Sequence, residues 1–167
     1  MPPLWVLIGL FMAVYASLSV GLTALLGLPW RVPMPFPVAL GVGGPLLALG
    51  TGLLVWAFRS LGLGRALGKE LFLPRSESHL VTDGIYAYTR NPLYLSVTIL
   101  FLGWFFILRL TPLALLTVLF FVHFLLVAKW EEKELRVRFG QEYDEYRKRV
   151  PLFIPCRRRA KRDIPSS

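Results

Sequence analysis

Four uncharged apolar runs constrain this chain more than any other feature of its sequence. They cover residues 4–28, 37–58, 93–108 and 110–128. A helix needs about 17 to 25 apolar residues to cross the hydrocarbon core of a bilayer, and only the third run is somewhat short. Hydrophobic residues make up 55% of the 167 residues, more than a soluble core of that size needs. The runs predict an all-α integral membrane protein with about four transmembrane helices.

The first run has a second interpretation, as a secretory signal peptide. It lacks a basic n-region, exceeds the usual length of an apolar h-region, and has no small-x-small cleavage site at residues 29–31. We therefore expect a transmembrane helix. The third and fourth runs are separated by a turn at residues 109–112, so we expect them to form a helical hairpin.

The basic residues predict how these helices are oriented. Of the 19 Lys and Arg residues, only Arg31 and Arg109 lie on one side of the predicted spans, which leaves 17 on the other. Cytoplasmic loops retain Lys and Arg, so both termini should be cytoplasmic. The basic cluster at residues 157–162 predicts contact with anionic lipid headgroups, and we expect no nucleic-acid partner.

The same reasoning divides the chain into three parts. Residues 1–59 form two N-terminal transmembrane helices, residues 60–155 hold an interfacial loop, the hairpin and a cytoplasmic helix, and residues 156–167 are a basic tail. The cytoplasmic helix is predicted to be amphipathic, and Gly140 is able to break it. Its apolar positions recur at close to helical spacing: Leu135, Phe139, Tyr143, Tyr146 and Val150.

Two features inside the spans are predicted to be structural. Gly44, Ala48 and Gly52 recur at four-residue intervals, a small-residue stripe that lets another helix approach closely in lipid. His123 lies within the fourth run, where a hydrogen bond to a neighbouring helix is a better interpretation than catalysis. No pair of His, Asp or Glu has metal-ligand spacing, so we predict no metal.

The hairpin predicts where polar residues converge. If its turn is centred near Leu110, then Pro92 and Ala128 each lie 18 residues from that turn and reach the same depth. Packed helices lie about 8 to 10 Å apart, so the residues flanking these positions should meet at the cytoplasmic rim. They are Arg90, Asn91, Glu131 and Glu132. Both an interfacial salt bridge and a binding site remain open at this point.

These residue types suit a ligand that carries both signs of charge. A helix N-terminus with an Arg suits a carboxylate, and a glutamate suits an ammonium or a sulfonium. The amino-acid end of S-adenosylmethionine presents both charges, and Tyr86, Tyr88 and Tyr94 offer aromatic faces for the adenine or the sulfonium. The residues permit this cofactor without requiring it.

Three motifs in order resemble the isoprenylcysteine carboxyl methyltransferase and phospholipid methyltransferase superfamily. They are the stretch GIYAYTRNPLY at residues 84–94, the pair Glu131-Glu132, and FGQEYDEYRKRVP at residues 139–151. The superfamily reads G-x-Y-x-x-x-R-H-P-x-Y before a hairpin, then E-E, then F-G-x-x-Y-x-x-Y. The likeness covers roughly residues 80–155, and the ordered set is more specific than any one motif.

The resemblance implies an S-adenosylmethionine-dependent methyltransferase with Arg90 as the catalytic residue that orients a substrate carboxylate. It implies seven cofactor-binding residues: Gly84, Tyr88, Asn91, Pro92, Tyr94, Glu131 and Glu132. Asn91 departs from the pattern, in which His is commonest. Because an amide takes no proton at neutral pH, a general-base role at this position is doubtful, and the substitution favours carboxylate methylation.

We therefore expect O-methylation of an isoprenylcysteine-type carboxylate, on a prenylated or other lipid-like substrate that enters from the bilayer to a cytoplasmic active site. Three alternatives remain. The first is N-methylation of a phospholipid amine such as phosphatidylethanolamine. The second is a sterol-type membrane reductase, which shares an Arg-x-Pro-x-Tyr stretch but is usually longer. The third is a non-catalytic membrane protein that binds anionic lipid.

Overall fold

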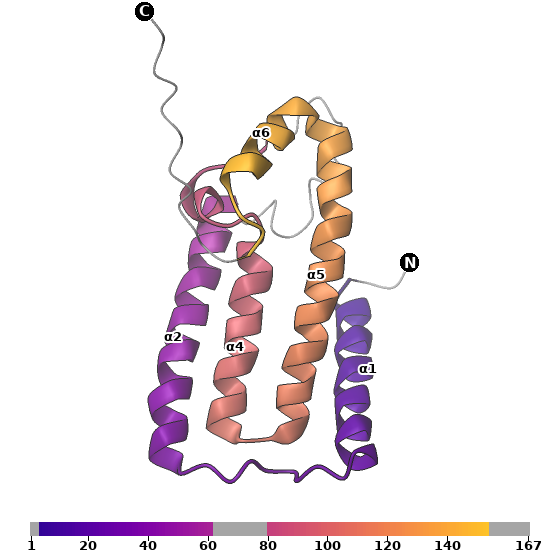
Figure 1. The fold of residues 1–167 in the computed structure, drawn as a ribbon, viewed down its shortest axis with the longest axis vertical. Helices are drawn as coiled ribbons and strands as arrows, with labels where there is room; N and C mark the ends of the chain where they lie inside the picture. Colours follow the sequence, from indigo (N-terminus) through magenta and orange to yellow (C-terminus); the bar gives the residue numbers. More distant parts are fainter. Residues whose placement is uncertain (1–3, 62–79, 154–167) are drawn as a thin grey trace, which may run out of the picture. The chain divides into compact units, whose positions relative to one another are not determined.

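The computed structural model describes residues 4–61 and 80–153, with residues 4–9 described by their backbone only. Most of the interfacial loop and the basic tail lie outside these residues. Within them the chain is helical, apart from connections and an isolated bridge between Arg31 and Leu110. The elements are α1 (Leu4–Leu25), α2 (Phe36–Leu61), the 3-10 helix η3 (Gly84–Ala87), α4 (Pro92–Leu108), α5 (Thr111–Phe139) and α6 (Gln141–Arg149) (Figure 1).

Among the residues whose side chains the structure describes, α2 and α5 are long and apolar enough to cross a membrane, and only 17% of the apolar window in each is buried. A core helix of a soluble protein would bury most of that window. α4 and the part of α1 from Leu10 to Leu25 are also apolar but shorter. The outward-facing apolar side chains, such as Val118 at 60% exposed and Leu126 at 63%, indicate a lipid environment.

The predicted hairpin is confirmed. α4 begins at Pro92, where the missing N–H of proline costs no hydrogen bond, and it ends at Leu108. α5 begins at Thr111 after a turn in which Arg109 has a positive φ of 57°. The ring of Phe101 stacks on that of Phe120 with 5.0 Å between centroids, so the two helices lie side by side.

α5 continues further than the fourth apolar run. The sequence predicted a change at Ala128, but the segment that follows has no glycine or proline, and the helix runs without interruption to Phe139. It ends because Gly140 adopts a φ of 54°, a left-handed conformation that glycine reaches at little cost. The predicted break at Gly140 is thus confirmed, and α6 begins directly after it.

Contacts divide the described chain into two compact units. The first contains the residues up to Leu54 together with Tyr94–Val127, and the second contains Val55–Leu93 and the residues from Ala128 onward. Both units are therefore discontinuous in sequence.

In the first unit α4 packs against α2 through glycines. A Cβ at Gly43 would lie 2.9 Å from the Gly103 carbonyl oxygen, and one at Gly50 would lie 2.8 Å from Leu100 Cγ. The predicted stripe of Gly44, Ala48 and Gly52 does not form this contact, because among the described residues nothing lies within 4 Å of a Cβ at Gly44 or Gly52, and Ala48 is exposed. The spacing of small residues did not determine which face of α2 meets α4.

α1 joins the first unit through aromatic and polar contacts with α5. The hydroxyl of Tyr15 lies 3.0 Å from Nδ1 of His123. The Tyr15 ring also stacks on that of Phe120, with 4.9 Å between centroids and 11° between planes. The prediction that His123 bonds a neighbouring helix is confirmed. In Figure 1 the helices of this unit follow the order α2, α4, α5, α1.

The core of the second unit is built on α6. Tyr143, Tyr146 and Val150 are buried, and Leu135 and Phe139 at the end of α5 pack against them together with Leu80. The sequence placed these five apolar positions on one face of a single helix. They do pack into one core, but they come from α5 and from α6 with the residue after it. Tyr146 fixes η3 to this core, because its hydroxyl donates to the Tyr86 carbonyl oxygen at 2.7 Å.

Candidate active site

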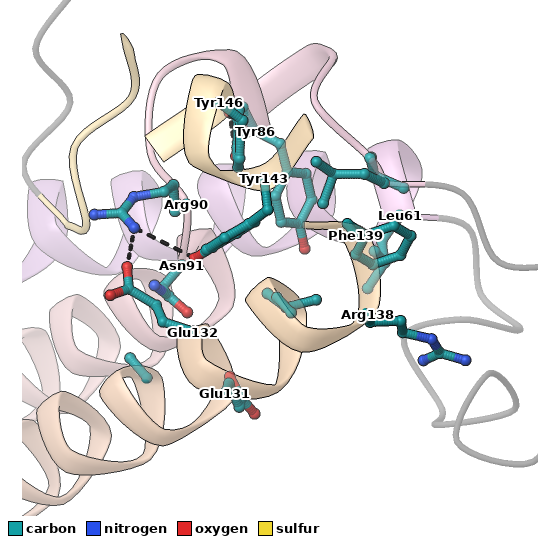
Figure 2. A pocket seen from close by; sticks show the side chains of 14 residues that line it. Leu61, Tyr86, Arg90, Asn91, Glu131, Glu132, Arg138, Phe139, Tyr143 and Tyr146 are labelled. Atoms are coloured by element: carbon teal, nitrogen blue, oxygen red, sulfur yellow. Dashed lines mark hydrogen bonds and ion pairs between the residues drawn. The ribbon is translucent and has the colours of Figure 1, made fainter. Parts of the chain in front are cut away.

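The second unit contains a pocket of about 160 Å³. Its polar lining comes from the residues just before α4 and from α5: Arg90, Asn91, Glu131, Glu132 and Arg138. Its aromatic lining comes from η3, the end of α5 and α6: Tyr86, Phe139, Tyr143 and Tyr146 (Figure 2). Aliphatic side chains, among them Leu61 and Leu135, complete the wall. Charge on one part of the wall and apolar surface on another suit an amphiphilic ligand.

Arg90 is the centre of the polar side of this pocket. Its Nη1 forms an ion pair with Oε1 of Glu132 and donates to the hydroxyl of Tyr143 at 3.3 Å (Figure 2). Both charged side chains are largely buried, at 10% and 12% exposed. Nε of Arg90 is also buried and has no hydrogen-bond acceptor among the described residues. A guanidinium has five N–H donors, so Arg90 has more donors than its contacts with Glu132 and Tyr143 use.

The backbone around Arg90 is fixed from a distant part of the chain. The Arg90 N–H donates to the Pro151 carbonyl oxygen at 3.0 Å, and the Asn91 N–H donates to the Leu152 carbonyl oxygen at 3.2 Å. Pro92 follows as a fully buried residue at the start of α4. The peptide that carries Arg90, between η3 and the start of α4, is thus held by two backbone hydrogen bonds.

Burial changes the acid–base properties of the lining. Burial, with a smaller contribution from the charge of Glu131, raises the pKa of Tyr86 to about 12. Burial also raises the pKa of Tyr143 and that of Tyr146. It lowers the pKa of Arg90, which nevertheless starts so high that the guanidinium stays charged at neutral pH. The pocket therefore presents protonated phenols and a cation at neutral pH.

The structure brings together four of the eight residues that the sequence placed in the site. Arg90, Asn91, Glu131 and Glu132 all line the pocket, as the depth of the hairpin predicted. The other four are not among the lining residues: Gly84, Tyr88, Pro92 and Tyr94.

Three of those four have packing partners elsewhere. Gly84 has a φ of 59°, and a Cβ there would collide with the Ser60 hydroxyl at the end of α2. The Tyr88 ring lies 6.0 Å from that of Trp56 and is 41% exposed. Tyr94 belongs to the first unit, where its ring stacks on Phe124 with 4.8 Å between centroids.

Sequence reasoning assigned Tyr143 and Tyr146 to the apolar face of a helix and did not propose them as site residues. Their spacing of three residues puts both rings on one face of α6, with 6.1 Å between centroids. That same face lines the pocket. The signal that could have identified Tyr143 and Tyr146 as site residues was their presence in the motif FGQEYDEYRKRVP at residues 139–151.

Histidine, cysteine and carboxylate side chains do not gather into a possible metal site in the part of the chain that the structure describes. His123, the histidine within that part, lies in the first unit, and His79 and Cys156 are outside the described residues.

Comparisons with known proteins match this region. A family model described as phospholipid methyltransferase matches residues 38–142, more than half of the chain. A methanethiol S-methyltransferase of Crocosphaera subtropica is 34% identical over 79 residues, which is 44% of this chain and 28% of that protein.

Two protein-S-isoprenylcysteine O-methyltransferases are also similar. That of Schizosaccharomyces pombe is 40% identical over 94 residues, 55% of this chain and 40% of its own length. That of Homo sapiens is 34% identical over 99 residues, 54% of this chain and 32% of its own length. The chain thus spans less than half the length of the curated relatives it matches. No solved structure matches it.

Proposed function

Because the chain belongs to the phospholipid methyltransferase family, we propose that it is an S-adenosylmethionine-dependent methyltransferase that acts on a lipid-like acceptor at a membrane. The observation that carries this proposal is the pocket in which Arg90 and Glu132, 42 residues apart in sequence, form a buried ion pair. Both residues lie within the range that the family model matches. The names of the three relatives, all methyltransferases, support the same reaction class.

The chemistry of the lining fits S-adenosylmethionine, whose sulfonium supplies an electrophilic methyl group when it is bound. The carboxylate of Glu131 lines the pocket and suits an ammonium. The rings of Tyr86 and Tyr143 offer faces for a sulfonium or an adenine. The guanidinium of Arg90, which lines the pocket, suits a carboxylate. We assign this group to the acceptor substrate, so Arg90 holds and aligns the group that is methylated.

The lining favours an acceptor that is already anionic. A carboxylate nucleophile needs no general base, whereas the ammonium of phosphatidylethanolamine must first lose a proton. The Asn91 amide cannot take that proton, and Tyr86, with a pKa of about 12, is protonated at neutral pH. Of the two carboxylates in the lining, Glu132 is paired with Arg90 and Glu131 is assigned here to the ammonium of the cofactor. The described pocket lining includes no histidine. These observations support O-methylation of an isoprenylcysteine-type carboxylate, with phosphatidylethanolamine N-methylation as the alternative.

We further propose that α1, α2, α4 and α5 cross the membrane, with both termini and the pocket on the cytoplasmic side. Arg31 pairs through its backbone with Leu110, next to Arg109, so the two basic residues predicted to face away from the cytoplasm lie at the same end of the first unit. The remaining 17 basic residues would then be cytoplasmic. On this topology, residues 60–155 form the catalytic region, and the tail at residues 156–167 contacts anionic lipids.

An acceptor assay tests the proposed reaction. Full-length protein in lipid nanodiscs is given radiolabelled S-adenosylmethionine with farnesylated cysteine, phosphatidylethanolamine or methanethiol. We expect label on the farnesylated cysteine as a base-labile methyl ester. Arg90→Lys keeps the charge but loses the planar two-pronged contact, so it should reduce turnover more than it reduces cofactor affinity.

The other outcomes are equally informative. Label on phosphatidylethanolamine alone would support the amine alternative, and label on methanethiol alone would show that the acceptor need not be a lipid. Failure of the parent protein to bind S-adenosylmethionine, measured by calorimetry, would contradict the methyltransferase proposal.

A further inference from the structure

The C-terminal part of the second unit contacts the peptide of Arg90 along its backbone. α6 ends at Arg149, and Val150 turns the chain into an extended conformation with a ψ of 129°. Residues 151–153, called the strap here, then run beside residues 89–91. The carbonyl oxygens of Pro151 and Leu152 accept the N–H groups of Arg90 and Asn91.

Side chains reinforce this pairing. The hydroxyl of Thr89 donates to the Leu152 carbonyl oxygen at 3.1 Å, and Nδ2 of Asn91 reaches the same oxygen at 3.4 Å. Thr89 is only 2% exposed, and Phe153 at the end of the strap is 8% exposed. The contact is therefore partly buried, with Thr89 and Phe153 shielded from solvent, and hydrogen bonds gain strength where the local dielectric is low.

The strap and α6 together hold Arg90 at both ends. The strap fixes its backbone, and Tyr143 of α6 contacts its guanidinium. Tyr143, Pro151 and Leu152 all follow residue 142, where the family match stops. The contacts that align Arg90 thus extend beyond the part of the chain that the family model matches.

We infer that the strap positions Arg90 for methyl transfer and that Thr89 is its side-chain anchor. Thr89 is a positioning residue, since it acts on Arg90 through the Leu152 carbonyl and does not line the pocket. The inference rests on the proposed function for its catalytic consequence, but the anchor itself is a structural claim that can be tested without activity.

The first test measures hydrogen–deuterium exchange at the amides of Arg90 and Asn91 in full-length protein. Thr89→Val removes the donor, so these amides should exchange about three- to tenfold faster, the effect of one lost hydrogen bond. Thr89→Ser keeps the hydroxyl and should restore slow exchange. Thr117→Val is the matched control, because Thr117 is also buried and donates to a carbonyl, that of Leu113 at 2.8 Å, within the first unit.

The second test compares kinetics with cofactor binding. In Thr89→Val, turnover should fall about three- to tenfold while the dissociation constant for S-adenosylmethionine changes less, and Thr89→Ser should recover turnover. Parent-like exchange in Thr89→Val, or equal exchange in the Val and Ser variants, would overturn the anchor. Faster exchange with unchanged turnover would overturn the positioning role. A parent protein that neither binds cofactor nor transfers methyl would refute the proposed function, while the exchange data would still decide the anchor.

Discussion

Glu132 contacts two arginines, Arg90 and Arg147, and only the pair with Arg90 is buried. Its Oε1 pairs with the buried Arg90, and its Oε2 lies 3.9 Å from Nε of Arg147, whose side chain is 49% exposed. Water and salt screen an exposed pair, which contributes about 0 to 1 kcal/mol. Removing one partner from a buried pair costs about 3 to 5 kcal/mol, since the other charge stays buried and uncompensated. The charge of Glu132 therefore acts mainly on Arg90.

We expect Glu132→Gln to reduce turnover about tenfold, the effect of losing the charge-assisted hydrogen bond that holds Arg90, and to lower the unfolding temperature, while S-adenosylmethionine affinity changes less. The amide keeps the length of the side chain and one acceptor oxygen. A methyl-transfer assay, calorimetric titration with the cofactor and a thermal melt in the same detergent measure these effects. Glu134→Gln is the matched control, because Glu134 is exposed on the same helix. Parent-like turnover in the Glu132 variant would reduce the pair to an interfacial salt bridge.

At the scale of the helices, the contact between α2 and α4 depends on backbone approach. A Cβ at Gly43 would lie 2.9 Å from the carbonyl oxygen of Gly103, and a Cβ at Gly103 would lie 3.0 Å from the backbone nitrogen of Leu47. Backbone atoms cannot rotate aside as a flexible side chain can. Close approach of this kind drives association in lipid, where apolar side chains gain nothing from leaving water.

Two adjacent glycines on α2 provide a matched comparison. Gly43→Ala should destabilise the protein by about 1 to 3 kcal/mol, the usual cost of an extra methyl group in a packed interface, because the α2–α4 contact must open. Gly44→Ala adds the same methyl group where none of the described residues has an atom within 4 Å, and should leave the unfolding temperature unchanged or slightly higher. Thermal melts of both variants in one detergent make the comparison. If Gly44→Ala proves the more damaging, the stripe predicted from the sequence is the true contact.

For the molecule as a whole, the lengths and positions of the apolar runs predicted more of the structure than the spacing of individual small residues did. The apolar runs located the helices, and the equal arms of the hairpin predicted that Arg90 would lie close to Glu132, as it does. That inference succeeds because helix rise fixes depth along the hairpin.

Two aspects were not predictable in this way. Gly43 and Gly44 both lie in a run of small residues, and only tertiary packing decides which of them faces α4. The pairing of Thr89 with Leu152 joins residues 63 apart through an extended segment that has no periodicity to read. The level of a residue along the hairpin was therefore predictable from the sequence. The face of α2 that meets α4 and the path of the non-helical segment at residues 151–153 were not.

The proposed topology of the whole molecule predicts the accessibility of two positions. Single cysteines at Pro35 and Glu145, in a Cys156→Ser background, should react with a membrane-impermeant reagent from opposite faces of sealed vesicles. Pro35 precedes α2 at the end that carries Arg31, and Glu145 is an exposed residue of α6. Labelling of both positions from the same face would contradict the four-helix arrangement.

The strap also determines the order in which the parts of this protein can form. The turn between α4 and α5 needs only neighbouring residues, so the hairpin can form as soon as its two helices exist. The Thr89–Leu152 contact closes a much longer loop and must wait until residue 152 has been synthesised. On the proposed topology, insertion of the hairpin into the membrane and assembly of the pocket are therefore separate events in time. A nascent chain would then hold its hairpin in the bilayer before the strap aligns Arg90, so it would reach the membrane before it could carry out the proposed reaction.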